Sequence, residues 1–134
     1  MKPAPDVNPP SKNGRSKYFR PQKCIDAIRS STTPATTQMN LGVLALFIKN
    51  YAGDLPLDLS GLDLSGLYLP HANLTGANLA RTKFIGATLD GADFTGATLT
   101  DAIFKNAYLK DAIFPREHAD LLSDDQKRQI KEWA

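Results

Sequence analysis

Residues 72–104 read ANLTGANLARTKFIGATLDGADFTGATLTDAIF, and a large apolar residue returns at every fifth position of this stretch. The register extends without a gap through Leu59, Leu64, Leu69, Leu74, Leu79, Phe84, Leu89, Phe94, Leu99, Phe104, Leu109 and Phe114. Two positions before each of these lies a second residue that could be buried, and it is apolar in all but one repeat: Leu57, Leu62, Leu67, Ala72, Ala77, Thr82, Ala87, Ala92, Ala97, Ala102, Ala107 and Ala112. The chain therefore contains a repeat of five residues that is used twelve times in succession.

A period of five fits neither regular secondary structure. On an α-helix each step of five residues rotates the apolar position by about 140°, so the apolar side chains would scatter around the cylinder. On a flat strand five is odd, so successive repeats would face opposite sides of the sheet. The pattern instead predicts a solenoid, in which a short backbone unit turns once per repeat and returns its side chain to a common interior.

Two further regularities agree with a solenoid. Glycines recur two positions after the large apolar residue, where a corner needs a residue that tolerates tight turning; they are Gly61, Gly66, Gly76, Gly86, Gly91 and Gly96. The phenylalanines Phe84 and Phe104, and likewise Phe94 and Phe114, are twenty residues apart. A coil of four repeats would stack each pair, although a period of ten residues would explain the spacing equally well.

The repeats resemble those of the pentapeptide-repeat family, whose pattern is roughly Ala-(Asp/Asn)-Leu-X-X. Residues 72–74, 77–79 and 92–94 match that pattern directly. The resemblance implies an all-β solenoid, namely a right-handed quadrilateral β-helix with four pentapeptides per coil, so that twelve repeats give three coils. The first coil departs from the pattern, because Leu57, Leu62 and Leu67 stand where the family has small residues.

A solenoid of three coils exposes apolar surface and unpaired backbone at both ends, so caps are expected. Residues 38–53 predict an N-terminal capping helix, with Lys49 in its last turn and Gly53 after it. Residues 116–134 predict a helical C-terminal cap, in which Ser123 begins a capping box and the helix extends to Trp133. Leu121, Leu122, Ile130 and Trp133 are expected to cover the last coil. The repeat domain is then residues 54–115.

Charge and cysteine content limit the classes of function. The chain of 134 residues has a net charge of +2, which is too small to predict a polyanionic partner. One cysteine, Cys24, excludes an internal disulfide and favours a reducing compartment such as the cytoplasm. No apolar run reaches the ~20 residues that span a bilayer. We therefore expect a soluble protein with no membrane span.

No residue pattern indicates catalysis, a metal or a cofactor. His71 and His118 are far apart in the sequence and have no partner at motif spacing, so both are interpreted as surface histidines. No phosphate-binding glycine loop, zinc spacing or EF-hand loop is present. The sequence therefore does not favour an enzyme.

The solenoid would instead supply flat outward faces. With four repeats per coil, one face carries Tyr68, Thr88 and Tyr108 in a row, and exposed aromatic side chains are good interface anchors. The same tyrosines could simply cover the wall. The neighbouring face would carry Asp63, Lys83 and Ile103, a mixed pattern typical of a solvated surface.

Residues 1–37 form a separate segment by composition, basic and rich in Pro, Ser and Thr, and predict an extended arm. Within it, basic and aromatic residues alternate at Arg15, Lys17, Tyr18, Phe19 and Arg20, which could bind an acidic protein groove or nucleic acid. A flexible solvated tail would have the same composition.

These features favour a non-enzymatic scaffold for protein-protein interaction or assembly, in which a rigid solenoid and a basic arm bind a protein partner or a larger complex. Two alternatives follow from the resemblance. One is a secreted bacterial effector that is delivered into host cells. The other is a DNA-mimicking protein that binds the topoisomerase gyrase, although the repeat section is short and carries a net charge of only −3. The oligomeric state and the partner are not predicted.

Overall fold

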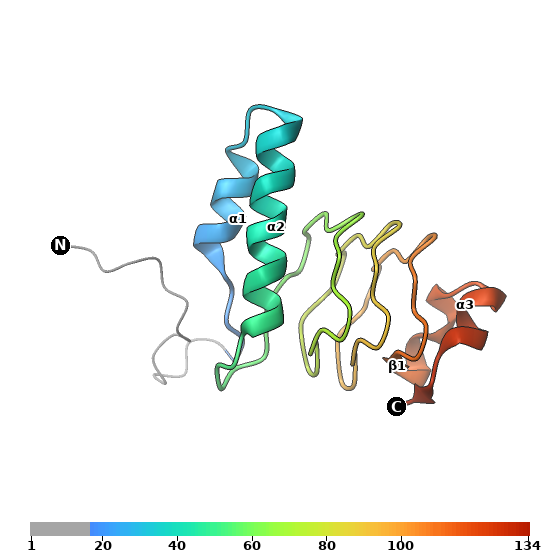
Figure 1. The fold of residues 1–134 in the computed structure, drawn as a ribbon. Helices are drawn as coiled ribbons and strands as arrows, with labels where there is room; N and C mark the ends of the chain where they lie inside the picture. Colours follow the sequence, from blue (N-terminus) through green and yellow to red (C-terminus); the bar gives the residue numbers. More distant parts are fainter. Residues whose placement is uncertain (1–16) are drawn as a thin grey trace.

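The computed structural model describes residues 17–134 and consists of a helical hairpin, a stack of turns and a small C-terminal cap (Figure 1). Helices α1 (Gln22–Arg29) and α2 (Pro34–Asn50) form the hairpin at one end of the stack. At the other end follow strand β1 (Ile113–Phe114), the 3-10 helix η1 (Arg116–Leu121), helix α3 (Asp124–Gln129) and strand β2 (Glu132–Trp133). The repeats lie between these two ends.

The backbone of the repeat segment returns beside itself every twenty residues. Parallel bridges join Asp58 to Asn78, Asn78 to Thr98, and each equivalent outward position to the residue twenty further along. Each bridge has two backbone hydrogen bonds; for example, Lys83 N donates to Leu62 O (2.9 Å) and Leu64 N donates to Lys83 O (2.8 Å). One turn therefore contains four pentapeptides, which settles the choice between ten and twenty residues.

All the predicted inward positions are buried. The large residues from Leu59 to Phe114 and the small residues from Leu57 to Ala112 form one continuous core, and the only polar side chain among them is Thr82. The Thr82 hydroxyl donates to Leu59 O at 2.9 Å. The rings of Phe84 and Phe104 stack at 5.1 Å, as their spacing in the sequence predicted.

The corners of the turns have the left-handed backbone conformation that the glycine pattern predicted. Gly86, for example, has φ +67°, a conformation that costs a glycine little. Some equivalent corners are occupied by other residues, among them Asp101 with φ 59° and His71 with φ 60°. The repeat therefore imposes this corner geometry even where the residue does not favour it.

The strands are shorter than an all-β solenoid suggests. Within residues 17–134 the only extended strands are β1 and β2, of two residues each. Neighbouring turns are otherwise joined by isolated bridges, because each repeat spends most of its five residues on a corner. The sheets of this fold therefore consist of short bridges between neighbouring turns, and not of long strands.

The extended arm predicted for residues 1–37 is wrong over its C-terminal part. Helix α1 occupies part of it, and α2 begins at Pro34, earlier than the helix predicted for residues 38–53, and ends at Asn50. Thr33 caps α2 by accepting a hydrogen bond from Thr36 N (3.1 Å), and Pro34 suits the first helical position. Helix α1 forms because Ile25 is buried against α2 and the core. Residues 1–16 lie outside the described residues.

The C-terminal cap differs from the predicted helix that extends to Trp133. The capping box of Ser123 is present, but α3 ends at Gln129, and the chain then runs as β2 parallel to β1. Lys131 N donates to Ala112 O and Ala134 N donates to Phe114 O, each at 2.8 Å. The chain leaves the helix because the open edge of the last turn offers these unpaired carbonyls. Leu122 is buried, and Leu121, Ile130 and Trp133 pack partly buried against the core.

Candidate interaction surface

The tyrosine row is present as a geometric feature. Parallel bridges join Tyr68 to Thr88 and Thr88 to Tyr108, so the three side chains lie above one another on one face. Tyr68 is 70% exposed and Tyr108 is 59% exposed. At about 4.8 Å between neighbouring turns, the two tyrosines are about 10 Å apart along the stack. Their spacing is fixed by backbone hydrogen bonds, so the row is rigid.

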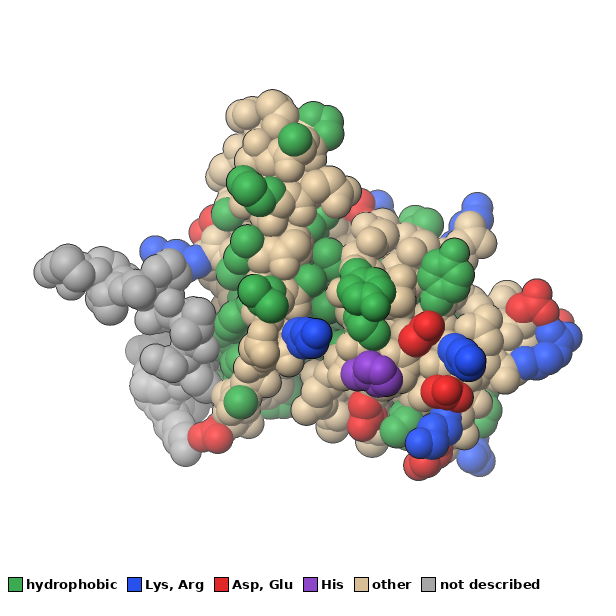
Figure 2. Space-filling model, viewed as in Figure 1, with side chains coloured by type: hydrophobic (Ala, Val, Ile, Leu, Met, Phe, Trp, Pro, Cys, Tyr) green, Lys and Arg blue, Asp and Glu red, His purple; other side chains and the backbone are tan. Residues whose placement is uncertain are grey.

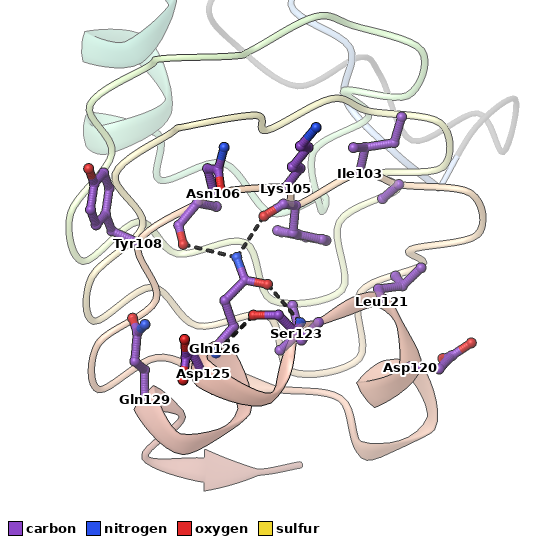
Figure 3. Close-up of a pocket in the computed structure, with 14 residues that line it drawn as sticks. Ile103, Lys105, Asn106, Tyr108, Asp120, Leu121, Ser123, Asp125, Gln126 and Gln129 are labelled. Atoms are coloured by element: carbon purple, nitrogen blue, oxygen red, sulfur yellow. Dashed lines mark hydrogen bonds between the residues drawn. The ribbon is translucent and has the colours of Figure 1, made fainter.

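The row ends at a groove between the last turn and the C-terminal cap (Figure 3). The groove has a volume of about 910 Å³. Ile103, Lys105 and Tyr108 line it from the turn, while Asp120 and Leu121 line it from the cap. Ile103 belongs to the neighbouring face with Asp63 and Lys83, so the groove crosses the corner between two faces. It therefore offers apolar, basic and acidic side chains within one depression.

Gln126 closes the inner end of this groove. Its side chain is buried, and its amide nitrogen donates to Phe104 O (2.7 Å) and Ala107 O (3.0 Å), as Figure 3 shows. Its amide oxygen accepts from Ser123 N at 2.9 Å. At Ala107 O the side chain of Gln126 thus performs the role that a backbone donor of a further turn would perform, because the equivalent Ala87 O accepts from Tyr108 N of the turn above.

Next to Gln126 the sheet edge remains open. In the turn below, Phe84 N donates to Ile103 O and Ile103 N donates to Thr82 O. The equivalent groups one turn further along are Phe104 N and Ala102 O, and within residues 17–134 neither has a hydrogen-bond partner. A donor and an acceptor at strand spacing, beside a groove, can pair with an extended backbone segment.

The predicted residues of the basic arm lie elsewhere. Phe19 is buried, bridges to Leu57 and stacks on the Tyr51 ring at 5.5 Å. The Arg20 guanidinium contacts the Asp58 carboxylate at 3.1 Å and donates to Ser60 O at 3.2 Å. Both side chains therefore hold the N-terminal segment against the first turn.

Lys17 and Tyr18, the other two described residues of the basic arm, directly precede Phe19 in the sequence. The Lys17 ammonium lies 5.6 Å from the centre of the Tyr18 ring, whereas Arg15 lies outside the described residues. Leu57 and Asp58, where this segment docks, belong to a face two repeats away from the face of Tyr68. The structure does not bring the two predicted sets of site residues together.

The roles of Gln126 and of the open edge in this surface do not follow from the sequence. The capping box that begins at Ser123 places Gln126 as the third residue of a helix, and the structure confirms that position. Nothing in the local pattern indicated that the same side chain would also reach the last turn, because that contact joins residues far apart in the sequence. The edge groups are backbone atoms, which no residue pattern marks.

Side chains that could support chemistry are dispersed. Within residues 17–134, no group of three or more His, Cys, Asp or Glu side chains is placed to hold a metal ion, and no helix is long and apolar enough to cross a membrane. Cys24 is half-buried, and this burial raises the pKa of its thiol. A raised pKa keeps the thiol protonated and poorly nucleophilic at neutral pH.

These observations define the class of protein: a short repeat protein with a rigid outer surface. The sequence model of pentapeptide repeats matches it in eight copies, over residues 58–96 and 77–114. The repeat segment belongs to the pentapeptide repeat family.

Among solved structures, one similar chain is HetL, a pentapeptide repeat protein involved in heterocyst differentiation regulation from the cyanobacterium Nostoc sp. strain PCC 7120. The match has 32% identity and a TM-score of 0.18, and covers 48% of this chain and 41% of HetL. This chain thus matches less than half of HetL's length. No curated protein matches the sequence.

Proposed function

We propose that this chain is a non-enzymatic protein-binding scaffold and that its partner binds the face of Tyr68, Thr88 and Tyr108 together with the adjoining groove. The proposal includes a right-handed β-helix of three coils over residues 54–115, with the α1–α2 hairpin and residues 116–134 as its end caps. The observation that carries it is the exposed tyrosine row, which is separated by one corner, along the groove, from the open sheet edge on either side of Ile103.

The two parts of this surface suit one ligand. Tyrosines at fixed spacing provide large, rigid contact area at low entropic cost. Beside them, Ala102 O and Phe104 N can accept and donate backbone hydrogen bonds to an extended segment. Lys105 and Asp120 on opposite walls of the groove favour a segment that carries both charges. The ligand is therefore expected to be a protein with an exposed, extended stretch of chain.

In this proposal Phe19 and Arg20 of the basic arm are not part of the partner-binding surface. The Phe19 ring packs on Tyr51 and the Arg20 guanidinium binds Asp58, so both residues stabilise the fold. No feature of residues 17–134 specifically favours the effector or the gyrase-binding alternative.

The test compares three baits in affinity purification from the source cells, followed by titration of the captured protein against each purified bait. The baits are the natural chain, a Tyr68→Ser/Tyr108→Ser variant, and an Asp63→Ser/Lys83→Ser control with equivalent outward positions on the neighbouring face. Two interface tyrosines of ordinary strength predict a dissociation constant about 30-fold higher or more for the tyrosine variant. The control should bind as tightly as the natural chain. Equal binding by all three baits would contradict the proposed surface.

A further inference from the structure

Helix α2 has apolar side chains on its exposed side as well as on its buried side. Leu41, Leu44 and Ile48 are buried, yet Met39, Val43 and Leu46 are 66%, 53% and 62% exposed. At 100° per residue, these three exposed side chains and Asn50 lie within about 60° of arc. We call this surface, formed by Met39, Val43, Leu46 and Asn50, the α2 stripe. In Figure 2 several separate apolar side chains lie along the upright hairpin.

The α2 stripe borders a hollow. Cys24, Phe47, Asn50 and Tyr51 line a depression of about 430 Å³ at the end of α2 that lies nearest the repeats. Val43 and Leu46 also line it. One helix face thus carries a projecting side chain, Met39, at one end and an apolar hollow at the other.

From these features we propose that the α2 stripe binds the α2 stripe of a second copy of this chain, in an antiparallel pair with a two-fold axis between Val43 and Leu46. In that register Val43 lies opposite the other copy's Leu46. Met39 lies opposite the other copy's Asn50 and reaches its hollow. A surface with a projection and a recess placed symmetrically about its centre is self-complementary, as a two-fold interface requires.

Charge favours the same arrangement. The only charged residue of α2 is Lys49, so the paired stripes bury no charge. In the antiparallel register the two Lys49 positions are separated by about 14 Å along the helix axis, whereas a parallel pair would place them side by side. Gly42 lies next to the stripe, and apart from its chain neighbours and the backbone of α2 no atom of residues 17–134 lies within 4 Å of its Cβ position, so the two helices can approach closely.

The inference goes beyond the proposed scaffold function, since it concerns the hairpin and not the tyrosine face. Such a pair would carry two tyrosine faces, one on each copy, and would bind a repetitive partner by avidity. Failure of either proposal leaves the other intact, because the variants that test them lie on different elements.

Sedimentation velocity of the full chain, as a concentration series up to about 100 μM, tests the pairing. The natural chain is expected to form dimers. Leu46→Arg places two like charges near the two-fold axis and should raise the dimer dissociation constant about 100-fold or more. Gln38→Arg adds the same charge to an exposed position on another side of α2 and should leave dimerisation unchanged. Leu46 is mostly exposed, so its variant should keep the circular dichroism spectrum of the natural chain.

Orientation is tested by disulfide trapping in a Cys24→Ala background. Met39→Cys with Asn50→Cys should give a covalent dimer on oxidation, while Gln38→Cys with Asn50→Cys should not. A natural chain that stays monomeric throughout, a dimer that survives Leu46→Arg, or trapping that does not distinguish the two cysteine pairs would overturn the proposal. Binding of the natural chain to lipid vesicles as a monomer through the same residues would also overturn it.

Discussion

Replacing Gln126 by methionine is expected to destabilise the C-terminal end of the repeat stack. The methionine keeps the length and most of the volume of the side chain but removes its amide. Ala107 O loses the only hydrogen bond that it accepts within the described residues, Ser123 N loses its acceptor, and Phe104 O keeps only its bond from Ala107 N. The perturbation is therefore an electrostatic one at a site that stays filled.

The expected loss is about 2–4 kcal/mol of unfolding free energy. A buried polar group left without a partner costs about 1–3 kcal/mol, and a hydrogen bond lost from a group that retains another costs about 1 kcal/mol. Ala107 O belongs to the first case and Phe104 O to the second. Ser123 is exposed, so water can replace part of the bond that its N–H loses.

Equilibrium unfolding in urea measures the effect, and Gln129→Met provides the matched control. Gln129 is on the same helix, and its side-chain oxygen accepts a single hydrogen bond, from Leu109 N at 3.0 Å. Leu109 is buried and its N–H has no other partner within the described residues, so we expect the control to lose about 1–3 kcal/mol, which is about 1 kcal/mol less than Gln126→Met loses. If Gln126→Met lost no more than Gln129→Met, the interpretation of Gln126 as a substitute for a further turn would be refuted.

Two further outcomes concern the corners and the hairpin. Gly86→Ala should lower the free energy of unfolding by about 1–2 kcal/mol because residue 86 has a positive φ. Gly91→Ala should lower it by about 1 kcal/mol more because the added Cβ would overlap the His71 ring. In urea unfolding, His71→Ala combined with Gly91→Ala should remove this difference, and a difference that persists would contradict the proposed overlap. Burial raises the pKa of Cys24, and burial together with the nearby Asp54 charge raises the pKa of Tyr51. The folded chain therefore holds these protons more tightly than the unfolded chain, so stability is full at neutral pH and should fall as the pH rises above the ordinary thiol pKa of 9.0. Melting temperatures across this range should show a shallower first decline for Cys24→Ala; an unchanged profile would contradict the assignment.

The repeat segment could be predicted closely because its determinants are local and repeated. The inward positions, the corners and the length of a turn all follow from residue spacing, and the stacking of Phe84 on Phe104 agrees with that spacing. The tyrosine row follows from the same arithmetic, and the structure places its residues as the sequence indicated.

The ends could not be predicted in the same way because they depend on contacts between distant residues. Helix α1 is short and carries a single buried residue, Ile25, so its sequence alone gives a weak helical signal. Phe19 looked like a ligand-binding aromatic but serves as a core residue, since Leu57 and Tyr51 provide its environment. Strand β2 exists only because the last turn presents an open edge.

The turn length of twenty residues also determines how this surface responds to changes in chain length. Inserting one pentapeptide between Tyr68 and Thr88 would preserve the burial pattern but advance everything downstream by a quarter of a turn. Thr88 and Tyr108 would then move together to the neighbouring face, and Tyr68 would stand alone. An insertion of four pentapeptides would restore the alignment and only lengthen the gap between the tyrosines. Evolution can therefore lengthen such a chain in steps of five residues without loss of its core, but can retain an aligned surface only in steps of twenty.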